Sequence, residues 1–268
     1  MPKCNVTDVW GSVESIRKLS PVIHNITNYV VMNSTANALL AIGASPVMAH
    51  ALEEMDEMVG IAAALVVNIG TLSREWIKAM FKAAERATLR NIPVILDPVG
   101  AGATSFRTET AREFIRVFRP SVIRGNASEI MSVYEDAGTT KGVDSTKASH
   151  DAVSTGMSIN EDYGSVVCIS GETDYVIDAG RIIKIRNGHK MMTRVTGLGC
   201  TATALCGAFA AVSENRAQAA AHAMAVMGIA GEIAAERAAG PGTLQVGFYD
   251  ALFNLSIDDI GQRLKVEN

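Results

Sequence analysis

The chain has 268 residues, of which 48% are hydrophobic and 19% charged, and its formal net charge is −4. This size and composition allow one large α/β domain or two small ones around a well-buried core. Lys and Arg are spread along the chain without a dense cluster, so we expect no nucleic-acid partner. The first eight residues lack the apolar run of a signal peptide, and we expect none.

The first half of the chain alternates short apolar runs with helical patterns. Apolar runs that predict strands occur at residues 22–24, 46–48, 64–70 and 92–97. Helices are predicted at residues 29–42, which Gly43 would end, and at residues 74–90, which Ser73 would cap.

The second half continues this alternation. We predict a helix at 108–118, strands at 121–124 and 165–170, and a hairpin of residues 174–178 and 181–185. A further apolar stretch at 219–232 is too short for a membrane span and is interrupted by His222 and Glu232. We therefore predict a buried helix there and expect no membrane partner.

Strands that alternate with helices of 10–18 residues predict a mostly parallel central sheet with helices on both faces, an α/β fold. We find no linker or repeat and expect a single domain over residues 1–268. Ligands of such sheets bind beyond the carboxyl ends of the strands. Polar or glycine residues at predicted strand ends are therefore site candidates: Asn68, Gly70, Asp97, Arg124 and Ser170.

A glycine turn at residues 196–200 (TGLGC) leads into a predicted helix of small residues. The start of a helix offers unpaired N–H groups and a partial positive charge. Gly197 and Gly199 would let this backbone approach an anion closely, so the turn is a candidate phosphate or oxyanion site. A turn that serves only packing remains the alternative.

The four cysteines show no C-x-x-C pair and no zinc spacing, which favours reduced cysteines in a cytoplasmic protein. Only Cys200 occupies a chemically suggestive position, in the first turn of the helix after the glycine turn. The helix dipole there is expected to stabilise a thiolate and lower its pKa. An inert buried cysteine is the competing interpretation.

Two further loops follow predicted strands. Asp97 begins a glycine-rich loop and could hold Mg²⁺ directly or through water, or simply cap backbone amides. Arg124 could contact phosphate oxygens. Asn126 and Glu129 form a pattern typical of a capping box, although Glu129 could instead join the water shell of a metal.

Taken together, these segments resemble the hydroxyethylthiazole kinase family of the ribokinase-like superfamily. The match extends from about residue 20 to residue 252 and keeps the segments in one order. The distinctive segments are residues 24–28 (HNITN), 43–49 (GASPVMA), 68–72 (NIGTL), 97–103 (DPVGAGA), 124–129 (RGNASE), 187–190 (NGHK), 196–200 (TGLGC) and 240–243 (GPGT).

The resemblance implies transfer of the ATP γ-phosphate to the hydroxyl of 4-methyl-5-(2-hydroxyethyl)thiazole, with Mg²⁺, in thiamine biosynthesis. It also implies a ribokinase-like fold and a homotrimer with substrate pockets between subunits. By the same resemblance, Met48 and Gly197 would contact the thiazole alcohol, with Asn25 and Gly70 as further lining candidates.

The remaining roles implied by the resemblance concern the nucleotide and the metal. Arg124 and Ser170 match ATP-contacting positions, and Asp97 and Glu129 match acidic positions near the metal. Residues 196–200 match the anion hole, which includes Thr196, Gly197, Gly199 and Cys200.

The chain departs from the pattern of the family in two places. Ser170 stands where Thr is common, which keeps a hydroxyl. Leu198 stands where Ala is common, and its side chain would have to be accommodated near the pocket.

Much of the superfamily has Asp as the base at the end of this turn, and here Cys200 occupies that position. A thiol binds its proton more tightly than a carboxylic acid, so Cys200 as the base is a hypothesis. Two other functions stay open. One is a kinase for another vitamin precursor, such as a hydroxymethylpyrimidine, and the other is a nucleotide-binding sensor that lost its base.

Overall fold

One nine-stranded sheet runs through the described part of the chain, which is residues 4–134 and 145–267 of the computed structural model. The strand order is β2-β1-β3-β4-β5-β6-β7-β8-β9. Strands β2 to β6 pair in parallel, and β6 to β9 pair antiparallel. The strands are β1 (Val22–Ile26), β2 (Ser45–Val47), β3 (Ala64–Asn68), β4 (Val94–Asp97), β5 (Val122–Asn126), β6 (Val166–Ser170), β7 (Asp174–Asp178), β8 (Arg181–Ile185) and β9 (Val266–Glu267).

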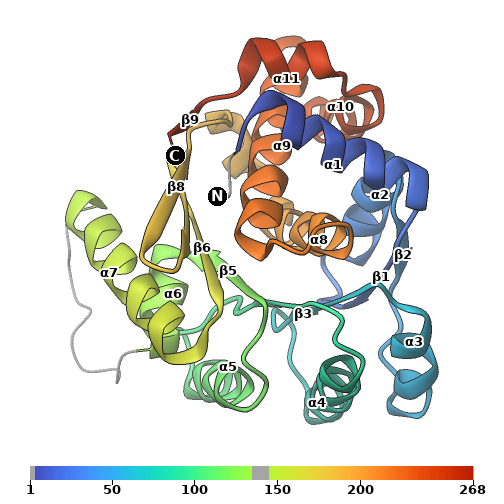
Figure 1. Cartoon of the computed structure of the whole chain (residues 1–268), viewed down its shortest axis with the longest axis vertical. Helices are drawn as coiled ribbons and strands as arrows, with labels where there is room; N and C mark the ends of the chain where they lie inside the picture. The colour runs from blue at the N-terminus through green and yellow to red at the C-terminus, as the bar shows by residue number, and fades with distance from the viewer. Residues whose placement is uncertain (1–3, 135–144, 268) are drawn as a thin grey trace.

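Helices cover both faces of this sheet (Figure 1). On one face lie α1 (Val6–Leu19), α2 (Met32–Ile42), α8 (Leu198–Ala211), α9 (Arg216–Arg237), α10 (Pro241–Asn254) and α11 (Ile257–Arg263). On the other face lie α3 (Met55–Ile61), α4 (Arg74–Leu89), α5 (Ser105–Phe118), α6 (Ala127–Tyr134) and α7 (Ser145–Tyr163). The predicted α/β architecture with helices on both faces is confirmed.

The central strands are apolar on both sides because each face of the sheet has its own core. Along β3, Val66 belongs to the core on the side of α8, whereas Leu65 belongs to the core on the side of α4. Along β4, Ile95 belongs to the same core as Val66, and Leu96 belongs to the same core as Leu65. This alternation is why the strands read as continuous apolar runs in the sequence.

Most predicted elements are confirmed, and the hairpin of β7 and β8 has the predicted bounds. Helix α5 begins at Ser105 rather than near residue 108, because the Thr104 side chain caps it by accepting a hydrogen bond from the Arg107 amide. Helix α2 begins at Met32 rather than at Tyr29. The residues before it form a turn in which the Val30 amide donates to Asn28 Oδ1.

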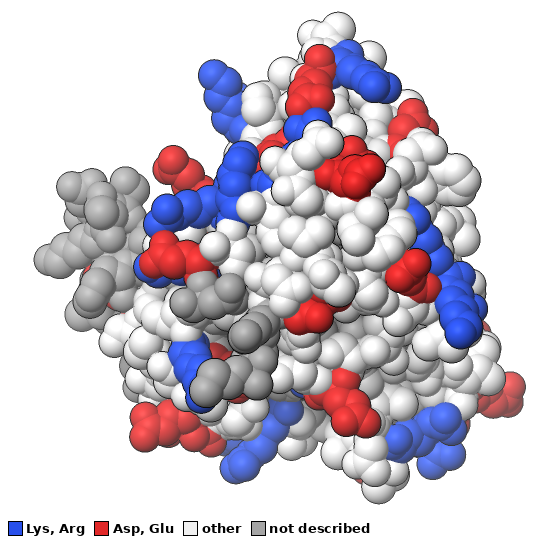
Figure 2. All heavy atoms as spheres, turned by 45° about the horizontal axis from the view of Figure 1, so that its top comes forward, with Lys and Arg blue, Asp and Glu red and all other residues white. Residues whose placement is uncertain are grey.

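The apolar stretch at 219–232 lies within α9 and is buried against the sheet, as predicted. Across the described residues, we find no helix that is both long and apolar enough to cross a membrane. Acidic and basic side chains are interspersed on the face that Figure 2 shows.

Helix α8, which carries the glycine turn, packs on the sheet through Gly207. A β-carbon there would meet Val66 Cγ2 at 2.6 Å and Ile23 Cγ2 at 3.3 Å. The absence of a side chain therefore sets how closely α8 approaches β1 and β3, and with it the height of the glycine turn above the strand ends.

We expect Gly207→Ala to destabilise the fold by about 1–3 kcal/mol, because the added methyl group overpacks a filled core. Gly11→Ala in α1 is the matched control, since a β-carbon there meets no atom within 4 Å. That control should be neutral or stabilise by roughly 0.5–1 kcal/mol through its higher helix propensity. Urea unfolding of both variants measures the difference, and equal midpoints would contradict the packing argument.

Candidate functional site

The carboxyl ends of the parallel strands meet below the first turn of α8 and enclose a hollow of about 410 Å³. Residue pairing fixes this edge, because Asn68 of β3 lies opposite Asp97 of β4 and Asn126 of β5 lies opposite Ser170 of β6. Most site residues predicted from the sequence line the hollow: Gly70, Asp97, Arg124, Glu129, Ser170, Thr196, Gly197, Gly199 and Cys200.

The glycine turn forms the roof of the hollow. Gly197 caps α8 with a left-handed φ of 84°, and a β-carbon there would meet Val31 Cγ1 at 2.6 Å. No described side chain caps the first amides of α8, so they are available to an anion. Leu198 points away from the hollow into the core, with 8% of its surface exposed. The expected conflict between Leu198 and the pocket therefore does not arise.

Cys200 lies in the first turn of α8, as predicted, and its Sγ accepts a weak hydrogen bond of 3.5 Å from Asn28 Nδ2. The prediction of a lowered pKa is wrong. Burial, reinforced by the negative charge of Asp97, raises the pKa of Cys200 to about 11, against the weaker effects of Asn68, Asn28 and Arg124. The thiol is therefore neutral near pH 7, because desolvation of a thiolate outweighs the attraction of the helix start.

Asp97 ends β4 and is 1% exposed. Burial raises the pKa of its carboxyl group to about 6; Arg124 opposes this shift, and the nearby Glu129 adds to it. Asn68 Nδ2 and Thr203 Oγ1 both donate to Asp97 Oδ2 at 2.8 Å. Asp97 is thus a carboxylate fixed by the protein and not a loop residue that caps backbone amides.

Arg124 is buried beside this carboxylate. Its Nη1 donates to the Gly199 carbonyl at 2.9 Å, and its Nη2 donates to Ser170 Oγ at 2.7 Å. Burial alone would lower the pKa of Arg124, but Asp97 and other nearby groups outweigh it and raise the pKa. The guanidinium therefore ties the roof of the hollow to β6. One N–H on each of Nη1 and Nη2 remains for other partners, while Nε is buried with no partner among the described residues.

Glu129 does close the predicted capping box. Its Oε2 accepts from the Asn126 amide at 2.9 Å, and Asn126 Oδ1 accepts from the Glu129 amide at 3.0 Å. Glu129 Oε1 also accepts from the Gly100 amide at 2.9 Å. The side chain thus joins the loop after β4 to the start of α6 while it borders the hollow.

Two predicted substrate residues do not line the hollow. Asn25 is fully buried in β1, and its Nδ2 donates to the Ile23 carbonyl at 2.8 Å. Met48 directly follows β2, the edge strand of the sheet, and its carbonyl lies 3.3 Å from His50 Nδ1. Neither side chain therefore contributes to the hollow as one chain forms it.

The sequence predicts Asn68 at the carboxyl end of a strand but assigns it no role. Asn28 and Thr203 are not predicted as site residues. These side chains are 1%, 4% and 0% exposed, and they form a connected polar network under the hollow. Asn28 precedes α2 and Thr203 lies within an apolar helix, so neither position carries a local signal. Only the packing of α8 over β4 brings Thr203 to Asp97.

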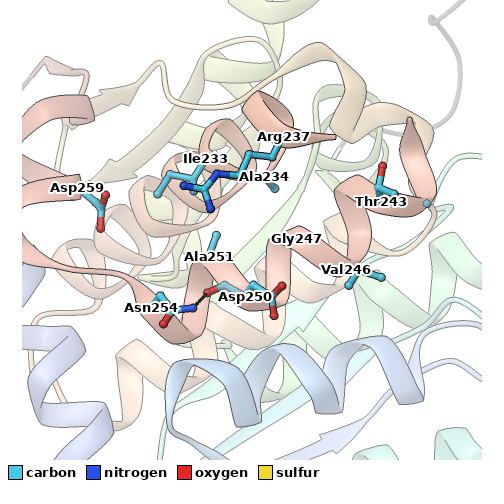
Figure 3. A pocket seen from close by; sticks show the side chains of 11 residues that line it. Ile233, Ala234, Arg237, Thr243, Val246, Gly247, Asp250, Ala251, Asn254 and Asp259 are labelled. Carbon is cyan, nitrogen blue, oxygen red and sulfur yellow. Dashed lines mark hydrogen bonds between the residues drawn. The ribbon is translucent and has the colours of Figure 1, made fainter. Parts of the chain in front are cut away.

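A second hollow of about 580 Å³ lies between α9, α10 and α11 (Figure 3). Arg237 and Asp250 border it and form no ion pair with each other in the described part of the chain. Gly242 and Thr243 of the GPGT segment line this second hollow, but none of the residues predicted to bind the substrate, nucleotide or metal does. We therefore place the candidate active site at the strand ends.

The donors around the first hollow fit a magnesium–nucleotide complex. No group of three or more His, Cys, Asp or Glu side chains is arranged for a metal within residues 4–134 and 145–267. A protein cage for the ion is thus not formed by the described residues, but Mg²⁺ usually takes one or two carboxylates and completes its shell with phosphate and water. Asp97 Oδ1, which accepts from no described donor, is the carboxylate oxygen that fits this role.

The arrangement of strands and helices is shared with solved structures of low sequence identity. A pyridoxal kinase from Staphylococcus aureus superposes with a TM-score of 0.64 at 16% identity, covering 92% of this chain and 97% of the other. A ribokinase-like superfamily protein from Enterococcus faecalis superposes with a TM-score of 0.64 at 11% identity, covering 94% and 89%. These likenesses show that the chain has a ribokinase-like fold.

The family within this class follows from closer similarities. The model of the hydroxyethylthiazole kinase family matches residues 13–258. A hydroxyethylthiazole kinase from Syntrophus aciditrophicus is 62% identical over 261 residues, which are 97% of this chain and 96% of the other. A solved hydroxyethylthiazole kinase from Pyrococcus horikoshii is 41% identical, with a TM-score of 0.90 and coverage of 97% and 98%. The chain belongs to the hydroxyethylthiazole kinase family.

Proposed function

We propose that this protein transfers the γ-phosphoryl group of ATP to the hydroxyl of 4-methyl-5-(2-hydroxyethyl)thiazole, a step of thiamine biosynthesis. The observation that carries the proposal is the uncapped start of α8, which opens onto the same hollow as Asp97 and Arg124. Full-length similarity to hydroxyethylthiazole kinases supports the choice of substrate.

Phosphoryl transfer passes through a loose transition state, so catalysis depends mainly on positioning the two substrates and stabilising negative charge. The amides of Gly199 and Cys200 bind the oxygens of the transferring group. Arg124 faces the ATP phosphates with its remaining N–H donors, and Ser170 and Thr196 border the nucleotide. Thr196 is exposed at the rim, and its hydroxyl is free to contact a phosphate.

Mg²⁺, when bound with ATP, neutralises charge on the phosphates. Asp97 holds it through Oδ1, directly or through water. Glu129 contributes negative charge and a water contact, while its two backbone hydrogen bonds keep it in place. Asp97 ends β4 and Glu129 lies in the first turn of α6, directly after β5, so both carboxylates would face a bound ion from neighbouring strand ends.

Cys200 is the side chain placed to receive the proton of the substrate hydroxyl. With a pKa near 11, only about one molecule in 10⁴ carries the thiolate at pH 7. Only this deprotonated fraction can accept the hydroxyl proton and become a thiol, because a neutral thiol already carries its own proton. The backbone of the turn supplies most of the rate acceleration, and the thiol is a modest base.

The thiazole alcohol lies on the side of the glycine turn that faces Gly197 and Gly70. Asn25 and Met48 contribute to its pocket from β1 and the edge after β2. Because Met48 lies outside the hollow of one chain, we propose that a neighbouring subunit completes the pocket in a homotrimer. Support comes from exposed apolar side chains next to this edge, Leu40 on α2 at 59% and Ile61 on α3 at 61% exposure.

The proposal extends to the whole chain and to its compartment. We infer a single domain over residues 1–268, although residues 1–3, 135–144 and 268 lie outside the described residues. The one sheet that spans both halves of the chain supports this inference. We place the protein in the cytoplasm, where its four cysteines, which form no disulfide in the described structure, would stay reduced.

ADP release measured with a coupled assay tests the function directly. We expect release only when ATP, Mg²⁺ and the thiazole alcohol are all present, because the cation offsets the negative charge of the ATP phosphates as the neutral alcohol attacks. Omission of Mg²⁺ or addition of EDTA should abolish turnover.

Competition between alcohols distinguishes the alternatives in the same assay. A hydroxymethylpyrimidine that is turned over in preference to the thiazole alcohol would favour the related vitamin kinase. ATP binding without release of ADP would favour a sensor. Absence of alcohol-dependent turnover would overturn the proposed activity.

Substitution of Cys200 tests its role as base. We expect Cys200→Ala to lower kcat by on the order of 10²-fold or less, because a mostly protonated thiol gives limited base catalysis. Cys200→Asp should retain or raise kcat near pH 7, since a carboxylate is ionised in a far larger fraction than the thiol, even where burial beside Asp97 raises its pKa.

The pH dependence separates these variants further. If the thiolate is the base, kcat of the natural protein rises about tenfold per pH unit between 7 and 9, because this range lies below a pKa near 11. The Cys200→Asp profile should be flat over that range. An unchanged kcat in Cys200→Ala would remove the base role.

Light scattering tests the assembly. Three chains of 28.4 kDa give a mass of about 85 kDa. Leu40→Asp should lower this mass, because it places a charge on the proposed interface. Leu89→Asp is the matched control, since Leu89 is 70% exposed at the end of α4, away from β2. A monomeric natural protein would contradict the trimer, and an unaffected Leu40→Asp would contradict the assignment of this surface.

A further inference from the structure

The carboxylate of Asp97 is held by the protein through one oxygen only. Asn68 Nδ2 and Thr203 Oγ1 both donate to Oδ2, each at 2.8 Å. No described group donates to Oδ1, and the residue borders the hollow. The two donors come from different layers of the fold, the end of β3 and helix α8. Together they fix the plane of the carboxylate and leave Oδ1 toward the ligand.

The amide of Asn68 has only one orientation that satisfies its neighbours. Its Oδ1 accepts from Asn28 Nδ2 at 2.8 Å and from the Gly70 amide at 3.0 Å. These two donors require oxygen on that side, so Nδ2 must face Asp97. Since Asn68 is 1% exposed, water does not compete for these bonds. Asn68 is therefore a fixed donor to the carboxylate.

The same network reaches the thiol. Asn28 Oδ1 accepts from the Val30 amide at 3.1 Å, which turns Nδ2 toward Asn68 and toward Cys200 Sγ. The side chain of Asn28 fits because position 70 is glycine: a β-carbon there would lie 2.6 Å from Asn28 Nδ2. One polar chain thus connects the carboxylate and the thiol under the hollow.

The hydroxyl of Thr203 donates to the carboxylate from within α8. Thr203 is completely buried in α8 among apolar neighbours, where an unbonded hydroxyl destabilises the fold. Its single hydroxyl proton has two acceptors in reach, Asp97 Oδ2 at 2.8 Å and the Gly199 carbonyl at 3.4 Å. The shorter and charge-assisted bond to Asp97 takes the proton.

We propose that Asn68 and Thr203 are positioning residues, which clamp Oδ2 of Asp97 so that Oδ1 is presented to the magnesium–nucleotide complex. This inference rests on the proposed kinase function for the identity of that ligand. It gives the hydroxyl of Thr203 an indirect part in metal binding. Thr203 does not line the hollow and acts by orienting Asp97. Residues that orient a metal ligand in this way typically matter 10- to 100-fold for metal affinity or activity.

The test compares Thr203→Val, which keeps the shape but removes the donor, with Thr203→Ser, which keeps the donor. The first readout is binding of Mn²⁺ to the protein with a non-hydrolysable ATP analogue, followed by electron paramagnetic resonance of free Mn²⁺. We expect about 10- to 100-fold weaker Mn²⁺ binding in Thr203→Val and recovery to within about threefold in Thr203→Ser.

Steady-state kinetics provide the second readout. Thr203→Val should lower kcat and raise the Mg²⁺ concentration needed for half-maximal rate, and leave KM for the thiazole alcohol unchanged. A loss of packing alone would not change kcat and the Mg²⁺ requirement while leaving KM for the alcohol unchanged. Nor would the smaller serine restore packing.

Thr35→Val in α2 is the matched control. Thr35 is 1% exposed, and its hydroxyl has no partner in the described part of the chain. The same substitution there removes no hydrogen bond, so Mn²⁺ affinity and kinetics should stay at the natural values. A loss of Mn²⁺ affinity in Thr35→Val equal to that in Thr203→Val would overturn the specific role of Thr203.

The proposed clamp would also be overturned if Thr203→Val bound Mn²⁺ as tightly as the natural protein. The same holds if Thr203→Ser bound Mn²⁺ as weakly as Thr203→Val. If Thr203→Val does not fold, Asn68→Ala removes the other donor to the same oxygen and is judged by the same Mn²⁺ measurement. Failure of the proposed function has a different signature: the natural protein would then show no thiazole-dependent release of ADP, whatever the Mn²⁺ result.

Discussion

The burial of the Asp97 carboxylate beneath the first turn of α8 is the constraint on which the site depends. A buried carboxylate is costly unless other groups compensate its charge. Here Arg124 supplies an opposing charge and two side-chain donors supply hydrogen bonds, and burial nevertheless keeps the pKa raised to about 6. This compensation requires that β3, β4 and β5 pair in the observed register and that α8 packs in its observed position above them. The stability of this edge and its chemistry therefore share the same contacts.

The same burial explains why the thiol and the backbone of the turn have different roles. Cys200 lies where superfamily relatives use a carboxylate, but a second negative charge close to Asp97 is unfavourable in a desolvated site. A thiol with a pKa near 11 avoids that repulsion by staying neutral. The amides of α8 carry no such cost, since their partial charge is fixed by the helix. In the proposed mechanism, anion binding therefore falls to the backbone and proton transfer to a modest base.

Glycines act in this structure where another element approaches closely. Gly207 lets α8 lie low on the sheet, Gly197 makes room for Val31 at a left-handed φ, and Gly70 makes room for Asn28. Gly70 was singled out from the sequence as a pocket residue. The structure gives it a further task, since the polar network beneath the hollow passes through the space that a side chain would fill.

The sequence by itself determined the α/β class, most of the strands, the capping box of Asn126 and Glu129, and the strand-end residues that meet at one edge. These features follow from local patterns: apolar runs, capping residues and the rule that parallel strands end together. Only the tertiary structure decided the raised pKa of Cys200, the turning of Leu198 into the core, the separation of Met48 from the hollow, and the bond from Thr203 to Asp97. Desolvation and contacts between residues about 100 positions apart depend on how α8 packs over the sheet, and no local pattern encodes that packing.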